Sequence, residues 1–125
     1  MKIKRFEDIK AWQEARALAN VIAKSVKENK ELQKNYRFKD QLLSAAVSIM
    51  ANIAEGFSRR SNKEFVQFLF VAKASAAELQ SHSYVALDQE YISKNRFNEL
   101  YEQIDRVSRL ISNFITYLLK HNKSD

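Results

Sequence analysis

The chain contains no proline and only one glycine in 125 residues, and this scarcity of helix-breaking residues constrains its fold more than any other feature. β-Turns and sheet edges depend heavily on those two residue types, whereas the long stretches rich in Ala, Leu, Glu, Lys and Gln favour helix. The length suits one domain with a core of its own. We therefore expect a single all-α domain over residues 1–125.

Hydrophobic residues recur at three- and four-residue steps in four segments, which is the spacing of one helix face. The four expected helices span residues of about 6–29, 36–57, 61–87 and 93–120. Ser61 and Glu64 have the spacing of a capping box, and Ser93 is a candidate N-cap. Short connections favour antiparallel neighbours, so we expect an antiparallel up-down-up-down four-helix bundle.

The second and third helices carry more apolar surface than a small bundle needs to bury. A thick core, or scattered surface apolar residues of the ordinary kind, is one explanation. Because two consecutive helices show the same excess, we favour a homo-oligomer interface. The expected interface residues are Leu43, Val47, Met50 and Ala54 on the second helix, and Val66, Phe70, Ala77 and Tyr84 on the third.

The only glycine lies in the segment 51–65, ANIAEGFSRRSNKEF. Glu55 precedes it, but a lone carboxylate lacks the paired group or nucleophile that catalysis requires. We expect Glu55, with Ser48 and Asn52, to belong to a solvated or hydrogen-bonded polar strip. Gly56 lies near the helix end, where it either adopts a left-handed conformation or lets two backbones approach closely.

Arg59 and Arg60 immediately precede the third helix, where unpaired amides and the helix dipole favour an anion, and Lys63 lies in its first turn. Two guanidinium groups there could hold a phosphate or a partner's carboxylate. The alternative is a charged surface turn that Glu55 and Glu64 neutralise.

In an up-down-up-down bundle, the turn between the second and third helices lies at the same end as both chain termini. The basic residues expected at this end are Lys2, Lys4, Arg5, Arg59, Arg60, Lys63, Lys120 and Lys123; the acidic ones are Glu7, Asp8, Glu55, Glu64 and Asp125. The net charge of +6 favours polyanionic partners. We expect contacts to nucleic acid or another anion from Arg59, Arg60, Lys63, Lys4 and Arg5.

Several classes of chemistry are not expected from this composition. The chain has no cysteine, and His82 and His121 are far apart, so we expect no metal site. Without a Gly-rich loop or a cluster of titratable groups, we expect no cofactor and no catalytic residue. The apolar runs are too short to span a membrane, and the start of the chain lacks a signal-peptide core, so we expect a cytoplasmic protein with no membrane partner.

The run at residues 41–59, QLLSAAVSIMANIAEGFSR, resembles the central signature of the four-helix-bundle proteins encoded in 23S rRNA intervening sequences, often labelled a ribosomal protein family. The opening at residues 5–15 and the third helix at 64–79 also resemble that family. The match covers nearly the whole chain. Its most specific part contains Asn52, Glu55 and Gly56, the residues to which we assign a structural role.

The resemblance implies an up-down bundle that assembles into a homopentamer. A related group, the accessory proteins of diversity-generating retroelements, forms similar basic barrels that bind nucleic acid and reverse transcriptase. This chain departs from the family where Leu43 and Ser44 occupy positions that are often basic, which removes part of the surface expected to bind RNA. It also has Met50 where a proline is common, so the second helix should be straighter.

Together these features predict a non-catalytic homo-oligomer, a pentamer by resemblance, that binds RNA or DNA backbones weakly through a basic end. Release of counterions would make such binding fall steeply with salt. The alternative is a protein-protein interaction adaptor whose partner is another polypeptide and which does not bind nucleic acid.

Overall fold

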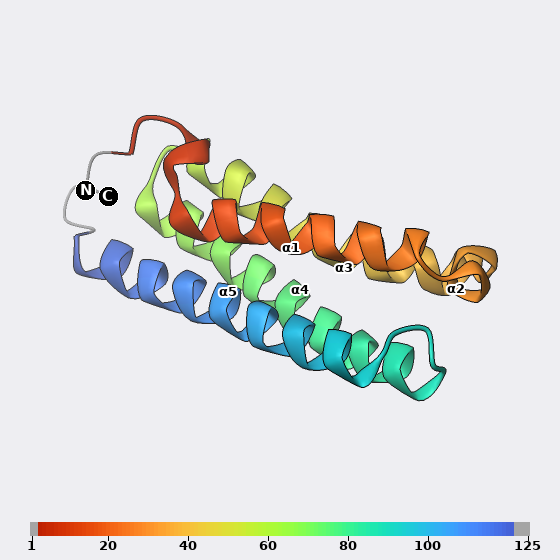
Figure 1. Cartoon of the computed structure of the whole chain (residues 1–125). Coiled ribbons are helices and arrows are strands. Elements are labelled where there is room, and N and C mark those ends of the chain that lie inside the picture. The colour runs from red at the N-terminus through yellow and green to blue at the C-terminus, as the bar shows by residue number, and fades with distance from the viewer. Residues whose placement is uncertain (1–2, 122–125) are drawn as a thin grey trace.

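The computed structural model describes residues 3–121, and within this range every regular element is helical. The bounds are Phe6–Asp8 for the short 3-10 helix η1, then Lys10–Lys27 (α1), Lys30–Lys34 (α2), Tyr36–Phe57 (α3), Asn62–Asp88 (α4) and Lys94–Lys120 (α5). The long helices α1, α3, α4 and α5 lie side by side and antiparallel (Figure 1). The expected all-α four-helix bundle is therefore confirmed.

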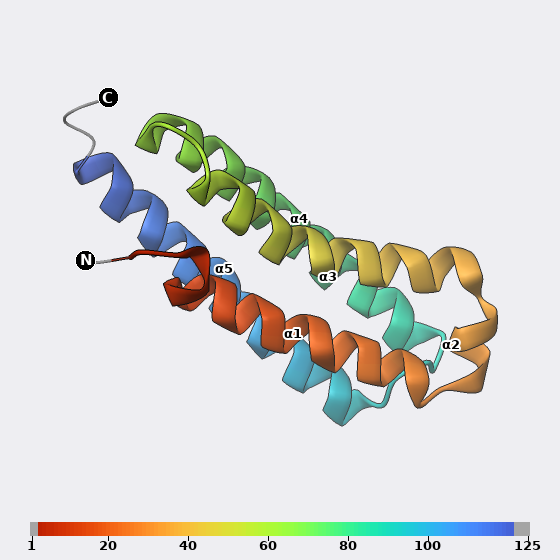
Figure 2. The same ribbon diagram turned by 90° about the horizontal axis from the view of Figure 1, so that it is seen from above.

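Each long helix packs against two others, in the cyclic order α1, α3, α4, α5. Consecutive long helices are thus neighbours, which is the up-down-up-down topology. Figures 1 and 2 place the start of α1, the α3–α4 turn and the end of α5 at one end of the bundle. We call this the terminal end (residues 3–12, 55–68 and 114–121) and the opposite one the α2 end (residues 25–37 and 88–99).

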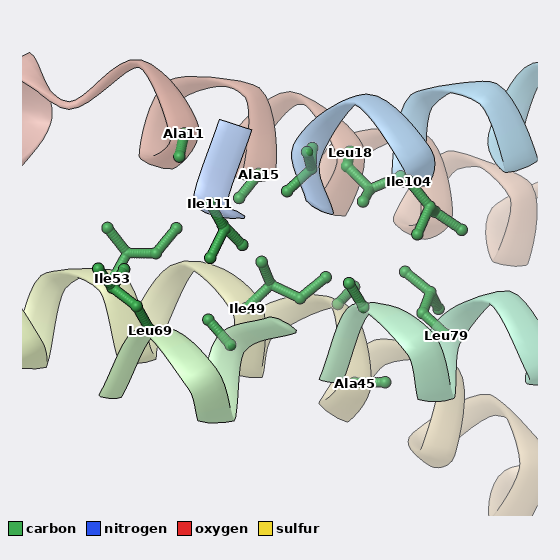
Figure 3. Packing of buried hydrophobic residues seen from close by; sticks show 14 of the residues in the cluster. Ala11, Ala15, Leu18, Ala45, Ile49, Ile53, Leu69, Leu79, Ile104 and Ile111 are labelled. Carbon is green, nitrogen blue, oxygen red and sulfur yellow. The ribbon is translucent and has the colours of Figure 1, made fainter. Parts of the chain in front are cut away.

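The bundle axis is filled by hydrophobic side chains from all four long helices. Leu18, Ile49, Leu79, Ile104 and Ile111 are fully buried, and Figure 3 shows these side chains converging between the ribbons. Burying one such side chain stabilises a fold by about 1.5–3 kcal/mol. The hydrophobic residues that recur at helical spacing in the sequence therefore form the core.

The first expected helix, residues 6–29, is wrong at both ends. Phe6–Asp8 forms a separate 3-10 turn, Ile9 is extended with φ −78° and ψ 121°, and α1 spans only Lys10–Lys27. The Asp8 carboxylate caps the start of this turn, because it accepts hydrogen bonds from the backbone amides of Lys4 and Arg5. Ile9, at the break, is buried in the core, with only 3% of its surface exposed.

Trp12 lies on the first turns of α1, and its side chain is half-buried. Its ring meets Phe6 edge to face, with 5.1 Å between centroids, and the guanidinium of Arg16 lies 5.9 Å from the ring centroid. The tryptophan therefore covers the edge of the core and does not fill its centre.

The polar stretch between the first two expected helices contains the short helix α2. Asn29 caps it by accepting a hydrogen bond from the amide of Leu32 at 2.8 Å, and Leu32 is fully buried. Asn35 caps α3 in the same way, accepting from the amide of Phe38 at 3.1 Å. Both asparagines are ordinary N-cap residues, so the signal for this turn was present in the sequence.

The expected starts of α4 and α5 are confirmed. Ser61 accepts a hydrogen bond from the amide of Glu64 at 3.2 Å, and Ser93 accepts from the amide of Arg96 at 3.0 Å. Among residues 3–121 only half of the expected capping box forms, because the exposed Glu64 side chain makes no bond back to the Ser61 amide.

Gly56 lies in the last turn of α3, buried against α4. Its φ is not positive, so it does not adopt the left-handed conformation. A Cβ at this position would come within 2.7 Å of Phe65 Cδ1 and 2.8 Å of Phe68 Cβ. The glycine therefore allows α3 and α4 to approach closely, and this approach fixes the position of the turn that carries the two arginines.

The polar strip of α3 is hydrogen-bonded and not merely solvated. Ser48 Oγ and Ser75 Oγ, from α3 and α4, share a hydrogen bond of 2.9 Å. The Asn52 amide donates to both the carbonyl oxygen and the hydroxyl of Ser48, at 2.8 and 3.0 Å. Asn52 therefore holds the serine that links the two helices.

Candidate nucleic-acid interface

The terminal end contains a cavity of about 360 Å³ between the α3–α4 turn, the last turn of α5 and the start of the described chain. Two guanidinium groups and several aromatic rings line it, and none of the described residues in its lining is a carboxylate. The residues that matter most for its chemistry are Arg59, Arg60, Asn62, Phe65, Tyr117 and His121.

Arg59 and Arg60 differ in how they are held. Arg59 forms an ion pair with Glu55 at 3.2 Å, and its guanidinium carbon lies 4.5 Å from the centroid of the Phe68 ring. Arg60 is exposed and, within the part of the chain that the structure describes, pairs with no carboxylate. Glu55 therefore offsets the charge of Arg59, and no carboxylate of the described residues offsets that of Arg60.

Arg5 already has an acidic partner. It donates two hydrogen bonds to the Glu7 carboxylate, at 3.1 and 2.8 Å. These bonds lower the pKa of Glu7 to about 2 and raise the pKa of Arg5. Lys4 and Lys63 are both exposed at this end. Lys2, Lys123 and Asp125, also assigned to this end from the sequence, lie outside the described residues.

A series of aromatic rings runs from the cavity wall to the protein surface. Phe65 meets Phe57 and Phe114 edge to face, at centroid distances of 6.1 and 5.3 Å. Phe114 then stacks on Tyr117, and Tyr117 on His121, at 6.2 and 4.2 Å. The imidazole at the end of this series belongs to an exposed residue, as a stacking platform requires.

Sequence reasoning missed His121 and Tyr117 as candidate site residues. Their spacing of four residues at the end of a helix was visible, and side chains four apart share a helix face. What the sequence could not show is that this face lies beside Arg59 and Arg60, because that proximity depends on how α4 and α5 pack.

The expected oligomer interface has an exposed part and a buried part. Val47, Phe70 and Tyr84 are 51%, 51% and 50% exposed, and Ala77 is exposed as well. Leu43, Met50 and Ala54 are half-buried, and the first two pack against the core. Val66 is a correction: only 5% of it is exposed, because it packs inside the chain, so it is not available to a second copy.

Two exposed valines extend this apolar surface beyond the expected residues. Val71 and Val85 of α4, next to Phe70 and Tyr84 in sequence, are 49% and 42% exposed. Tyr84 is also in contact with α5, since its ring lies 4.8 Å from Phe97 and 6.0 Å from Tyr101. The exposed surface of α4 therefore carries two apolar patches, Phe70 with Val71 and Tyr84 with Val85.

The α2 end contains a second cavity, of about 430 Å³, with a different chemistry. Arg96 lies at its centre and donates to the hydroxyl of Ser25. The same guanidinium forms ion pairs with Glu28 at 3.3 Å and Glu99 at 3.2 Å. Its charge is therefore satisfied by the protein itself, which makes this cavity a structural link between α1 and α5.

The described residues contain no group of three or more His, Cys, Asp or Glu side chains that could hold a metal ion. Within the same residues, no helix has the length and hydrophobicity required to cross a bilayer. His82 is paired with Glu78 at 3.3 Å on one turn of α4, remote in sequence from the terminal-end cavity.

The fold places the chain in the class of small antiparallel four-helix bundles. The family model of the 23S rRNA-intervening sequence protein matches residues 7–113. The chain belongs to the 23S rRNA-intervening sequence protein family.

One similar solved structure is the crystal structure of a protein with unknown function from the S23 ribosomal protein family, from Bacteroides thetaiotaomicron VPI-5482. It superposes with a TM-score of 0.77 at 23% sequence identity, covering 84% of this chain and 97% of that one. At that identity, the likeness supports the fold alone. No curated protein matches the chain.

Proposed function

We propose that this chain is a non-catalytic homo-oligomer, a pentamer, that binds RNA or DNA backbones weakly through its terminal end. The observation that carries this proposal is the cavity beside Arg59 and Arg60, whose lining includes no carboxylate among the residues that the structure describes. Phosphate groups pair well with guanidinium groups that have no internal acidic partner, and within the same residues Arg60 meets this condition.

The electrostatics of the whole chain favour the same partner. The net charge of +6 attracts polyanions over distances beyond direct contact, and each neutralised phosphate releases counterions. Such contacts are insensitive to sequence, since they reach the backbone and not the base edges. The related accessory proteins of diversity-generating retroelements bind nucleic acid as well as a polypeptide partner, so the resemblance is compatible with nucleic-acid binding.

The apolar face of α3 and α4 supports self-association. Val47, Phe70 and Tyr84 each leave about half of their surface exposed, and Val71 and Val85 add exposed apolar surface on α4. In a ring whose axis runs along the bundles, every terminal end would face the same side. Several weak phosphate contacts would then act on one strand and raise the overall avidity.

The first test is the double variant Arg59→Ala/Arg60→Ala, with binding to RNA measured over a series of salt concentrations. We expect weaker binding and a salt slope that falls by roughly one for each phosphate that the variant no longer neutralises. The matched control is Lys34→Ala/Arg37→Ala, which removes two exposed positive charges from the α2 end and should weaken binding much less.

An unchanged affinity and slope in the Arg59/Arg60 variant would show that these residues do not bind the phosphates. If the unmodified protein binds no nucleic acid even at low salt, the adaptor alternative is favoured. Self-association is tested by sedimentation of Phe70→Glu, which should dissociate the oligomer. Leu119→Glu, at a 56% exposed position on α5, is its control. A single copy at high concentration in the unmodified protein would contradict the oligomer.

A further inference from the structure

We propose that the terminal-end cavity holds one unpaired nucleotide of a single-stranded nucleic acid. Its base stacks on the imidazole of His121, and its phosphate pairs with Arg60. This inference rests on the proposed function, because it concerns the same end of the molecule. It adds a definite ligand, an unstacked base, to a proposal that otherwise involves only the backbone.

The aromatic side of the site is a continuous stack. Phe114, Tyr117 and His121 lie one turn apart along α5, and their rings are stacked with centroid distances of 6.2 and 4.2 Å. His121 Nδ1 lies 2.8 Å from the carbonyl oxygen of Tyr117, which fixes the orientation of the imidazole. Tyr117 stacks on one face of the imidazole, and His121 is exposed among the described residues, so the proposal assigns the other face of the ring to the base.

The ionic side of the site lies across the same cavity. Arg60 and His121 both line it, together with the Asn62 side chain at the start of α4. The cavity at the α2 end offers a contrast, since Glu28 and Glu99 line it and pair with its arginine. Of these two cavities, only the one at the terminal end combines aromatic stacking with positive charge that the described residues do not neutralise.

The size of the cavity favours one nucleotide over a duplex. Its volume of about 360 Å³ lies near the lower limit of small-molecule sites, which run from about 300 to 1,000 Å³. The bases of a duplex are paired and stacked inside the helix, so a duplex presents only phosphates to Arg60. An unpaired base can leave its stack and lie on an aromatic ring, and such stacking tolerates any base.

The test compares the full-length protein with His121→Ala and His121→Phe. The probes are a single-stranded oligonucleotide carrying one 2-aminopurine and a duplex of the same sequence. We expect His121→Ala to weaken single-strand binding about tenfold, the effect of losing one stacked base, and to leave duplex binding unchanged. His121→Phe should keep the single-strand affinity, because it keeps an aromatic ring.

The fluorescence of 2-aminopurine reports a change in the stacking of that base, since its emission depends on the rings that lie against it. The unmodified protein and His121→Phe should change the emission, and His121→Ala should change it much less. Tyr36→Ala is the matched control, because it removes a 70% exposed aromatic ring from the α2 end. Circular dichroism confirms that each variant keeps its helices.

Each outcome bears on one of the two proposals. If His121→Ala binds single strands as the unmodified protein does, the stacking site is overturned, while binding through Arg59 and Arg60 stands. An equal loss on single strands and on the duplex also overturns it, since His121 would then contribute charge and not a platform. If the unmodified protein binds neither probe at low salt, both proposals fail.

Discussion

The two ends of the bundle are held together by different forces. At the terminal end, α3 and α4 meet through apolar contact, with Gly56 against Phe65 and Phe68, and Arg60 has no acidic partner among the described residues. At the α2 end, Arg96 joins α1 to α5 through Ser25 and two carboxylates. One arginine, Arg96, therefore joins two helices at the α2 end, whereas another, Arg60, is left exposed at the terminal end.

This difference separates structural charge from charge that is available to a partner. A guanidinium with two carboxylates and a hydroxyl around it gains little from a phosphate, because binding would break existing pairs. An exposed and unpaired guanidinium has no ion pairs to break when it binds a phosphate. The local pairing of each arginine is thus a better guide to a binding surface than the net charge of the chain.

The largest expected effect comes from Gly56→Ala at the terminal end. The added Cβ would lie 2.7 and 2.8 Å from two phenylalanine side chains, so α3 and α4 must move apart. We expect the free energy of unfolding to fall by about 2–3 kcal/mol, measured by urea denaturation. Alanine otherwise favours a helix over glycine by about 1 kcal/mol, so a more stable variant would show that the close approach is not required.

A smaller effect separates the two arginines. Arg96→Ala removes a partner from Ser25, Glu28 and Glu99, and we expect it to lower the free energy of unfolding by about 1–2 kcal/mol. Arg60→Ala should leave stability within about 0.5 kcal/mol of the original, because its exposed side chain stabilises little. If both variants lowered the free energy of unfolding equally, the two arginines would not differ in their contribution to stability.

The smallest effect concerns a paired carboxylate at the terminal end. The hydrogen bonds from Arg5 lower the pKa of Glu7 from 4.5 to about 2. A lowered pKa means that this pair stabilises the folded state above pH 4.5, and that the contribution is lost as the pH falls toward 2. An NMR titration of Glu7 should show the low value, and Arg5→Ala should return it toward 4.5. Equal values in both proteins would mean that the pair does not form in solution.

The helices could be predicted from the sequence because their signals are local. The capping serines at 61 and 93, with the three- and four-residue periodicity, gave the starts of α4 and α5 to within a residue. The break at Ile9 was missed because hydrophobic periodicity does not report a single extended residue between two helical segments. Helix α2 was missed although Asn29 and Leu32 signalled it.

The candidate site could be predicted only in part. Arg59 and Arg60 could be singled out because they precede a helix. Which of the two forms an ion pair with Glu55 depends on the folded geometry of the turn. Val66 looked like a surface residue because it falls beside the core stripe, and the actual rotation of α4 buries it. The aromatic stack of α5 became a candidate only when packing placed it beside the α3–α4 turn.

We expect the two hydrogen bonds of the Asn35 side chain to form on different time scales. Its oxygen caps α3 across three residues, so that bond can close as soon as a single helical turn exists. Its nitrogen donates to the Tyr91 hydroxyl at 3.0 Å, across a separation of 56 residues. This second bond can form only when the chain between the two residues has brought its ends together. One amide group thus joins a fast local step of folding to a slow global one, and it connects the two turns at the α2 end.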